Sequence, residues 1–260
     1  MQKSLQESKS IGLVLSGGGV RGMAHIGLIK ALREHDIAVN CIAGSSVGAL
    51  VGALCAKGNS IEEMLQFFRD TPVFQYSFFA LGKPGLIDIE RYIPILKKYF
   101  DKDDFSTLNI PLFVVATDLM NGQEKVFQKG ELIRPILASA ALTPFFSPIE
   151  IDGVLYADGG IMNNFPKEYV ENECDFVIGS NVSITERLQK KDLRNSLQLA
   201  GRITGLMIYA SCREKIGECN MMIEPQELSQ IGVFDKKGID KAFTIGYDAA
   251  SFALEKALSV

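Results

Sequence analysis

The sequence predicts an α/β fold in which a mostly parallel sheet is sandwiched between helices. Short apolar runs alternate with helical patterns along the whole chain, and no repeat, low-complexity tract or long linker interrupts them. This alternation is typical of parallel strands that are joined by helices. With 260 residues, of which 47% are hydrophobic, the chain is long enough for one domain with a large core. We therefore expect a short, flexible polar tail at residues 1–10 and a single domain over residues 11–260.

Five apolar runs have the length of strands buried in a sheet. They span residues 11–15, 40–43, 111–117, 149–157 and 174–179. Apolar residues at helical spacing predict six helices. These span residues 23–32, 61–69, 89–99, 131–141, 192–212 and 239–258.

Three consecutive glycines, Gly17, Gly18 and Gly19, lie between the first strand and the first helix. Their backbone is able to approach a ligand closely, and the free amides at the start of the helix favour a negative charge. With Gly22 the loop also satisfies G-x-G-x-x-G, the fingerprint of a dinucleotide site. That alternative requires a carboxylate at the end of the second strand, which has none, because Asp36 lies in the turn before it. The glycine loop alone is compatible with a nucleotide-binding site. It favours an acyl-transfer site only together with the segment around Ser46 that follows it.

Ser46 lies between Gly44 and Gly48, at the junction of the second strand and the next helix. This G-x-S-x-G spacing is that of a nucleophile elbow, a turn so tight that a Cβ at either glycine would collide with its neighbours. Ser46 is therefore the candidate nucleophile, and the glycine loop is the candidate oxyanion hole.

Three motifs in this order resemble those of the patatin-like phospholipase family. They are G-G-G-x-R-G at residues 17–22, G-x-S-x-G at residues 44–48 and D-G-G at residues 158–160, supported by the small-residue and proline segment 138–148. The likeness spans residues 11–165. It implies a three-layer α/β/α lipid acyl hydrolase with a Ser-Asp dyad, in which Ser46 is the nucleophile and Asp158 the base. It also implies an oxyanion hole formed by the loop residues Gly17, Gly18, Gly19, Arg21 and Gly22.

The two histidines of the chain bear on whether an imidazole activates the serine. His25 is expected about 9 Å along the first helix from its anion-binding end, too far to contact Ser46 easily. His35 lies in a polar helix end, where it is expected to be solvated or to cap the helix. We therefore predict a direct Ser-Asp pair, with a triad through His25 as the alternative. Such a carboxylate has to be partly buried, because burial raises its pKa above the usual value of about 3.9.

Four aromatic residues, Phe74, Tyr76, Phe78 and Phe79, lie in a segment bounded by two prolines. Aromatic side chains in a surface loop are unusual unless they contact a ligand, a membrane or a local cluster. The segment is therefore either a lid or acyl-chain wall that touches lipid, or a small hydrophobic cluster packed under the loop.

Charge and cysteine content exclude several classes of function. A net charge of −4 provides no basic footprint for nucleic acid. The five cysteines are odd in number and form no C-x-x-C pair, which favours reduced thiols in a cytoplasmic protein without a zinc site. The uncharged run 37–56 has the length of a membrane span, but its glycines and polar residues divide it into strand, turn and buried helix. The basic residues of segment 187–194 are interleaved with acidic ones, so a solvated face is favoured over contact with anionic headgroups.

Together with the resemblance, these observations predict a cytoplasmic serine hydrolase that acts on a phospholipid or another lipid ester. No cofactor and no metal are expected, and peripheral contact with a membrane is expected through the aromatic loop. A transacylase or weakly active acyl-binding protein on the same fold stays open as an alternative, as does a nucleotide-binding oxidoreductase built on the glycine loop. The head group, the acyl-chain length and the oligomeric state are not predicted.

Overall fold

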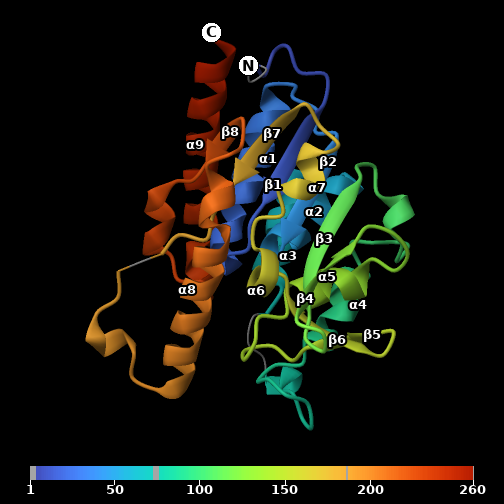
Figure 1. Ribbon diagram of the computed structural model, residues 1–260, viewed down its shortest axis with the longest axis vertical. Helices are drawn as coiled ribbons and strands as arrows, with labels where there is room; N and C mark the ends of the chain where they lie inside the picture. Colours follow the sequence, from blue (N-terminus) through green and yellow to red (C-terminus); the bar gives the residue numbers. More distant parts are fainter. Residues whose placement is uncertain (1–3, 73–75, 186, 260) are drawn as a thin grey trace.

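In the computed structural model, which describes residues 4–72, 76–185 and 187–259, eight strands form one sheet with helices on both faces (Figure 1). The strands are β1 (Ile11–Leu15), β2 (Cys41–Ser45), β3 (Leu112–Asp118), β4 (Gln123–Phe127), β5 (Ile149–Ile151), β6 (Val154–Asp158), β7 (Phe176–Ser180) and β8 (Met221–Ile223). The helices are α1 (Met23–Glu34), α2 (Val47–Lys57), α3 (Ile61–Asp70), α4 (Ile93–Leu96), α5 (Ile133–Ser139), α6 (Gly160–Asn163), α7 (Glu168–Glu171), α8 (Ser196–Ile216) and α9 (Ile239–Leu258).

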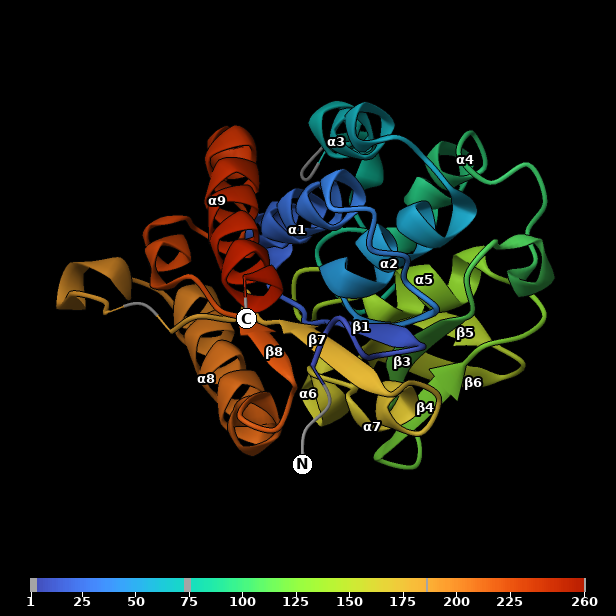
Figure 2. The same cartoon turned by 90° about the horizontal axis from the view of Figure 1, so that it is seen from above.

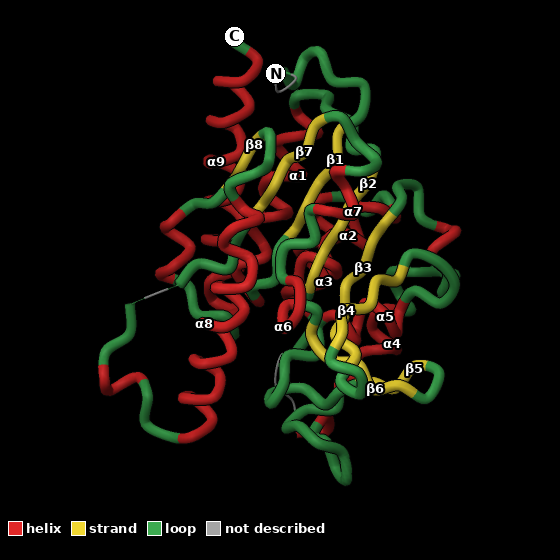
Figure 3. The backbone as a smooth tube through the Cα atoms, viewed as in Figure 1, coloured by secondary structure: helices red, strands yellow, loops and turns green. Residues whose placement is uncertain are grey.

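The sheet is parallel in its centre and antiparallel at one side. Strands β3, β2, β1, β7 and β8 pair in this order, and all four pairings are parallel. Strands β4 and β6 run antiparallel to β3, and β5 runs antiparallel to β6 (Figure 3). The expected parallel sheet is thus confirmed, with an antiparallel extension that the alternation of strand and helix does not predict.

Three layers are visible when the molecule is seen from above (Figure 2). Helices α1, α2, α3 and α9 cover one face of the sheet, and α6, α7 and α8 cover the other. Strand β1 contributes to both interfaces, because successive side chains of a strand point to opposite faces. Leu13 and Leu15 belong to the large core on the α1 side, and Val14 packs in the smaller core that contains Phe165 and Cys212. The chain is therefore an α/β/α sandwich.

Two expected elements are divided in the structure. The expected helix 89–99 is a 3₁₀ turn over Ile89–Tyr92 followed by the short α4. Pro94 lies in the first turn of α4, where its missing N–H is tolerated, but it prevents one continuous helix through this segment. The expected strand 149–157 is the hairpin β5–β6, because Asp152 and Gly153 have φ values of +50° and +79°. Two consecutive positive φ values are those of a type I′ hairpin turn, for which Asp-Gly is a preferred sequence.

The first described residues are packed on the domain. Leu5 is buried, and the side-chain amide of Gln6 donates a hydrogen bond to the Leu258 carbonyl at the end of α9. These contacts attach part of the expected tail to the domain, because the apolar side chain of Leu5 packs in the core.

Candidate active site

Ser46 sits on a strained turn between β2 and α2. Its φ of +55° and ψ of −127° are unusual for a residue with a side chain, and such strain is common at functional turns. A Cβ added to Gly48 would lie 2.2 Å from the Leu15 carbonyl oxygen, and one added to Gly44 would lie 2.6 Å from the Ala49 nitrogen. Both contacts are with backbone, which cannot move aside. The two glycines are therefore steric requirements of the turn that presents Ser46.

The hydroxyl of Ser46 is hydrogen-bonded directly to a buried carboxylate. Ser46 Oγ donates to Asp158 Oδ2 at 2.7 Å, and the N–H of Gly160 donates to Asp158 Oδ1 at 2.8 Å. Asp158 is 2% exposed. Burial raises the pKa of its carboxyl to about 6, while the hydrogen bonds from Ser46 and Gly160 favour the charged form and limit the rise.

The two residues meet because β2 and β6 end head to head on the same edge of β3. Strand β2 pairs with β3 up to Ser45 opposite Val115, and β6 pairs with β3 from Asp158 opposite Ala116. Strand β4 pairs with β3 at both positions and so occupies the other edge. Because β2 is parallel and β6 antiparallel to β3, the carboxyl ends of β2 and β6 are adjacent along that edge. The sheet register therefore brings together side chains that are 112 residues apart in sequence.

Ser139 connects the nucleophile turn with the aspartate turn. Its hydroxyl accepts a hydrogen bond from the N–H of Ser46 at 2.9 Å, and its carbonyl accepts one from the N–H of Gly159 at 3.1 Å. Ser139 is fully buried. Sequence reasoning noted the segment 138–148 only as a whole and did not single out this residue, although a serine among small apolar residues is a signal that a buried polar bond has to be made.

The glycine loop lies beside Ser46, but its amides are not equivalent. A Cβ added to Gly17 would lie 3.0 Å from the Ser46 Cβ. The N–H of Gly17 donates to Asn164 Oδ1 at 3.0 Å, and the N–H of Val20 donates to the Val233 carbonyl at 2.8 Å. Among the hydrogen bonds of residues 4–72, 76–185 and 187–259, none uses the N–H of Gly18 or Gly19. Gly17 was expected to be a donor for an oxyanion, yet its amide is already bonded to a side chain.

Arg21 holds the walls of the site together. It is 3% exposed, its Nε donates to the Ile231 carbonyl at 2.6 Å, and its Nη1 donates to the Ile184 carbonyl. Gly22 is a close-packing position, since a Cβ there would lie 2.5 Å from Val47 side-chain carbons. Arg21 and Gly22 thus connect the glycine loop to neighbouring segments.

Asn164 was not identified from the sequence, although it follows the D-G-G motif closely. It is 1% exposed and lines the same cavity as Ser46 and Asp158. Its Oδ1 accepts the Gly17 N–H, so it ties the glycine loop to the turn that contains Asp158.

Among the described residues, neither histidine is hydrogen-bonded to Ser46. His25 is fully buried, and its Nε2 donates to the Ser16 carbonyl at 2.9 Å, so its Nδ1 accepts from the Ser180 hydroxyl at 2.8 Å. Burial lowers the pKa of His25 to about 4, which keeps the imidazole neutral at physiological pH. His35 is the C-cap of α1, with Nδ1 2.9 Å from the Ala31 carbonyl oxygen, in agreement with the expected capping role.

Ser46 and Asp158 line a cavity of about 490 Å³. This volume is within the range of about 300–1,000 Å³ that is typical of small-molecule sites. Most of its wall is apolar. Helices α2, α3, α5 and α8 contribute Leu50, Phe68, Leu137 and Ile208, and the loop before α9 contributes Phe234. The site thus joins a hydroxyl, a carboxylate and backbone amides to an apolar chamber.

The aromatic loop next to the cavity is partly described. Phe74 lies outside the described residues, as does the side chain of Tyr76. Phe78 packs on the core with its ring 5.1 Å from that of Tyr92, whereas Phe79 is 48% exposed. For Phe78 the cluster under the loop is therefore the correct alternative.

The structure also bears on the cysteines, on metal binding and on membrane-spanning helices. All five cysteines are free thiols, as their odd number predicts. Among the described residues, no three His, Cys, Asp or Glu side chains are arranged to hold a metal ion. No helix in that part of the chain is long and apolar enough to cross a membrane.

Comparison with known proteins agrees with the motifs and with the fold. The model of the patatin-like phospholipase family matches residues 13–170, which is more than half of the chain. The chain belongs to the patatin-like phospholipase family. It is 37% identical over 164 residues to an uncharacterized NTE family protein of Mycobacterium bovis, a match that covers 61% of this chain and 45% of that protein. It is 33% identical over 171 residues to the neuropathy target esterase sws of Drosophila melanogaster, covering 63% of this chain and 12% of the esterase.

The match thus spans less than half the length of these curated relatives. Among solved structures, VipD from Legionella pneumophila has a similar fold, with a TM-score of 0.52 over 96% of this chain and 67% of VipD. The sequence identity to VipD is 15%, so that likeness concerns the fold alone.

Proposed function

We propose that the chain hydrolyses carboxylic esters of lipids, with Ser46 as nucleophile and Asp158 as general base. The observation that supports this most directly is the 2.7 Å hydrogen bond from Ser46 Oγ to Asp158 Oδ2 at the wall of a large apolar cavity. Membership of the patatin-like phospholipase family supports a lipid substrate, and one relative carries the name of an esterase.

The first half of the reaction forms an acyl-enzyme. Asp158 takes the hydroxyl proton of Ser46 while Oγ bonds to the ester carbonyl carbon, and the carbonyl oxygen becomes an oxyanion. The amides of Gly18 and Gly19 donate to that oxyanion, because both residues line the same cavity as Ser46 and their N–H groups are not used in other hydrogen bonds of the described residues. The N–H of Val47, the first residue of α2, is a further donor at a helix N-terminus. The carbon–oxygen bond to the alcohol then breaks, and the leaving oxygen takes the proton from Asp158.

The second half releases the acyl group. Asp158 accepts a proton from water as the water oxygen attacks the acyl carbon, and Ser46 Oγ leaves with that proton. Gly17, Arg21 and Gly22 hold the loop in place, with Asn164 bonded to the Gly17 amide. The apolar cavity accommodates the acyl chain.

Covalent labelling tests the proposal. Wild-type protein should be labelled by a fluorophosphonate on Ser46 alone and should hydrolyse a soluble short-chain ester. Ser46→Ala should lose both labelling and hydrolysis but keep its thermal stability. A second variant, Ser45→Ala, changes the neighbouring serine and should retain labelling. Undiminished hydrolysis by Ser46→Ala would contradict the assignment. Labelling with acyl-enzyme accumulation but slow release would favour the transacylase or acyl-binding alternative.

A further inference from the structure

Helix α8 lines the cavity with one face and exposes large apolar side chains on the opposite face. Gly201, Thr204, Gly205 and Ile208 line the cavity. On the other side Leu199, Ile203, Leu206 and Met207 are between 41% and 68% exposed, and we call these four residues the outer stripe of α8. Their spacing of i, i+4, i+7 and i+8 places them on one side of the helix. A surface helix normally directs polar residues outwards, so an outer stripe of large apolar side chains indicates a binding surface.

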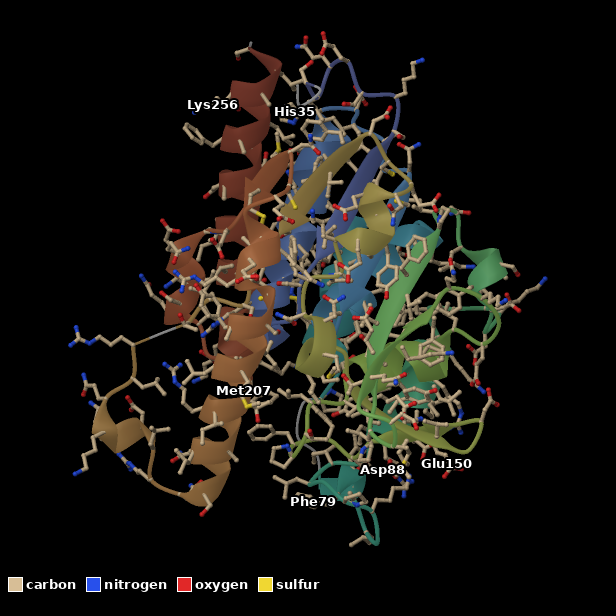
Figure 4. The ribbon with its side chains drawn as sticks, viewed as in Figure 1. His35, Phe79, Asp88, Glu150, Met207 and Lys256 are labelled. Carbon is tan, nitrogen blue, oxygen red and sulfur yellow. The ribbon has the colours of Figure 1, made fainter. Side chains whose placement is uncertain are left out.

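A second exposed apolar segment lies close to α8, and both contact the cavity-lining residue Phe145. Leu81 is 92% exposed and Leu86 42% exposed, in the loop that also contains Phe79. The N–H of Leu86 donates to the Phe145 carbonyl at 3.2 Å, and a Cβ added to Gly201 of α8 would lie 3.2 Å from the Phe145 ring. Both segments thus flank the same stretch of the cavity wall. Figure 4 shows Phe79 and Met207 in the lower half of the molecule, at the end away from Lys256.

The segment that leads into α8 is cationic, although the chain as a whole has a net charge of −4. Residues 187–194 include four cationic side chains and one carboxylate, and all five are exposed. The cations are Arg187, Lys190, Lys191 and Arg194. Among the ion pairs of the described residues, none involves these four. An apolar stripe next to a local group of cations is the pattern of a helix that lies in a membrane interface.

We propose that the outer stripe of α8 docks on the surface of a lipid bilayer that contains anionic headgroups. The stripe enters the boundary between headgroups and acyl chains, and the cations of segment 187–194 meet the lipid phosphates and carboxylates. The inner face of the same helix lines the cavity with Ser46, so docking places one wall of that cavity next to the bilayer. The inference rests on the proposed function in one respect, which is that the bilayer supplies the lipid ester that the site hydrolyses. Helix α8 lies outside residues 13–170, the segment that matches the family.

Vesicle flotation with Ser46→Ala protein tests docking without hydrolysis. The parent should float with vesicles of phosphatidylcholine and phosphatidylserine, and less with phosphatidylcholine alone. Adding Ile203→Glu and Met207→Glu should weaken binding about tenfold or more, because two apolar side chains no longer enter the interface. The milder Met207→Gln should weaken it less. Lys190→Gln with Lys191→Gln should reduce the preference for phosphatidylserine by about thirtyfold, since each of the two cations contributes about 1 kcal/mol. The matched control is Phe252→Glu in α9, which replaces another exposed apolar residue (71%) and should bind like the parent.

Three results would overturn the inference. The first is that the parent binds neither kind of vesicle, and the second is that the stripe variants bind as well as Phe252→Glu. The third is that gel filtration shows a dimer, which dissociates when the stripe is changed. The last result would assign the stripe to a second copy of the chain. In protein that retains Ser46, the stripe variants should hydrolyse a soluble ester at the wild-type rate. They should hydrolyse vesicle phospholipid more slowly than the wild type does. Failure of the proposed function would instead appear as absent hydrolysis of every ester, with vesicle binding unaffected.

Discussion

Burial of Asp158 affects activity and stability in opposite directions. A carboxyl group with a pKa near 6 is a better proton acceptor than one with the ordinary value of about 3.9. The same burial disfavours the ionised form in the folded protein. Each effect leads to a measurement.

The first prediction concerns the pH dependence of hydrolysis. Asp158 accepts the Ser46 proton only when it is ionised, so kcat/KM should rise with pH and reach half its plateau near pH 6. The profile should be recorded with a soluble ester that does not ionise in this range. A midpoint near pH 4, the ordinary value for an Asp carboxyl, would contradict the raised pKa of Asp158.

The second prediction concerns Asp158→Asn. The variant should lose about 10²–10⁴-fold in kcat, the range for removal of a general base. The pKa of Asp158 is higher in the folded than in the unfolded protein, so protonation of this carboxyl stabilises the fold. The stabilisation is fully present below about pH 4, and it is lost as the pH rises through about 6. Above pH 6 the variant should therefore be more stable than wild type, by up to about 3 kcal/mol. Thermal melts at pH 8 and pH 4 check this, and the advantage should vanish at pH 4. Lower stability at pH 8 would show that the carboxylate is needed for folding.

At the scale of elements, the loop before the 3₁₀ turn Ile89–Tyr92 combines a core residue with a surface residue. The ring of Phe78 is in edge-to-face contact with Tyr92, whereas Phe79, the next residue, is 48% exposed. Neighbours in such a loop point in different directions, so a pattern of aromatic residues alone does not distinguish their roles.

The third prediction compares Phe78→Ser with Phe79→Ser. Loss of the packed ring should destabilise the fold by about 1–3 kcal/mol, and loss of the exposed ring by less than about 1 kcal/mol. Phe79→Ser should reduce hydrolysis of vesicle phospholipid more than hydrolysis of a soluble ester, because the chemistry at Ser46 is unchanged. Denaturant melts and paired assays measure both effects. Equal destabilisation by the two variants would place Phe79 in the core cluster as well.

At the scale of the whole molecule, the cavity is formed by segments from all parts of the chain. Helices α2, α3, α5 and α8 and the loops around Ile184 and Val233 all contribute to its wall. Gly205 of α8 lines it, and a Cβ added there meets no heavy atom within 4 Å. This position is therefore open to a larger side chain.

The fourth prediction is that Gly205→Phe changes the chain-length preference. The ring should occupy part of the cavity and raise KM for long-chain esters about tenfold, with little effect on short-chain esters. Gly205→Ala is the control, which should keep both activities and stabilise α8 by about 1 kcal/mol. Equal losses on long and short esters would mean that the acyl chain does not pass this part of the wall.

The sequence by itself determines the local parts of this protein. The elbow around Ser46 is readable from the spacing of its two glycines, although the backbone that excludes a Cβ is local only for Gly44, at Ala49, and comes from Leu15 of β1 for Gly48. The central strands and the amphipathic helices follow from periodicity, and α3 and α9 lie almost where it places them. The burial of Asp158 was expected because a direct Ser-Asp pair needs it. The hairpin β5–β6 was missed, because residues 149–157 were expected to form one strand, although the Asp-Gly turn within them is a local signal for a hairpin.

Contacts between distant segments decide the rest. Ser46 and Asp158 meet because β2 and β6 share one edge of β3, and that register depends on pairing across more than a hundred residues. The amide of Gly17 is bonded to Asn164, 147 residues away, so the choice of free donors in the glycine loop is visible only in the folded chain. Helix periodicity likewise predicts α8 but not which apolar face lines the cavity and which faces solvent. Such features arise from packing between layers, and local sequence patterns contain no information about which distant surface a side chain will meet.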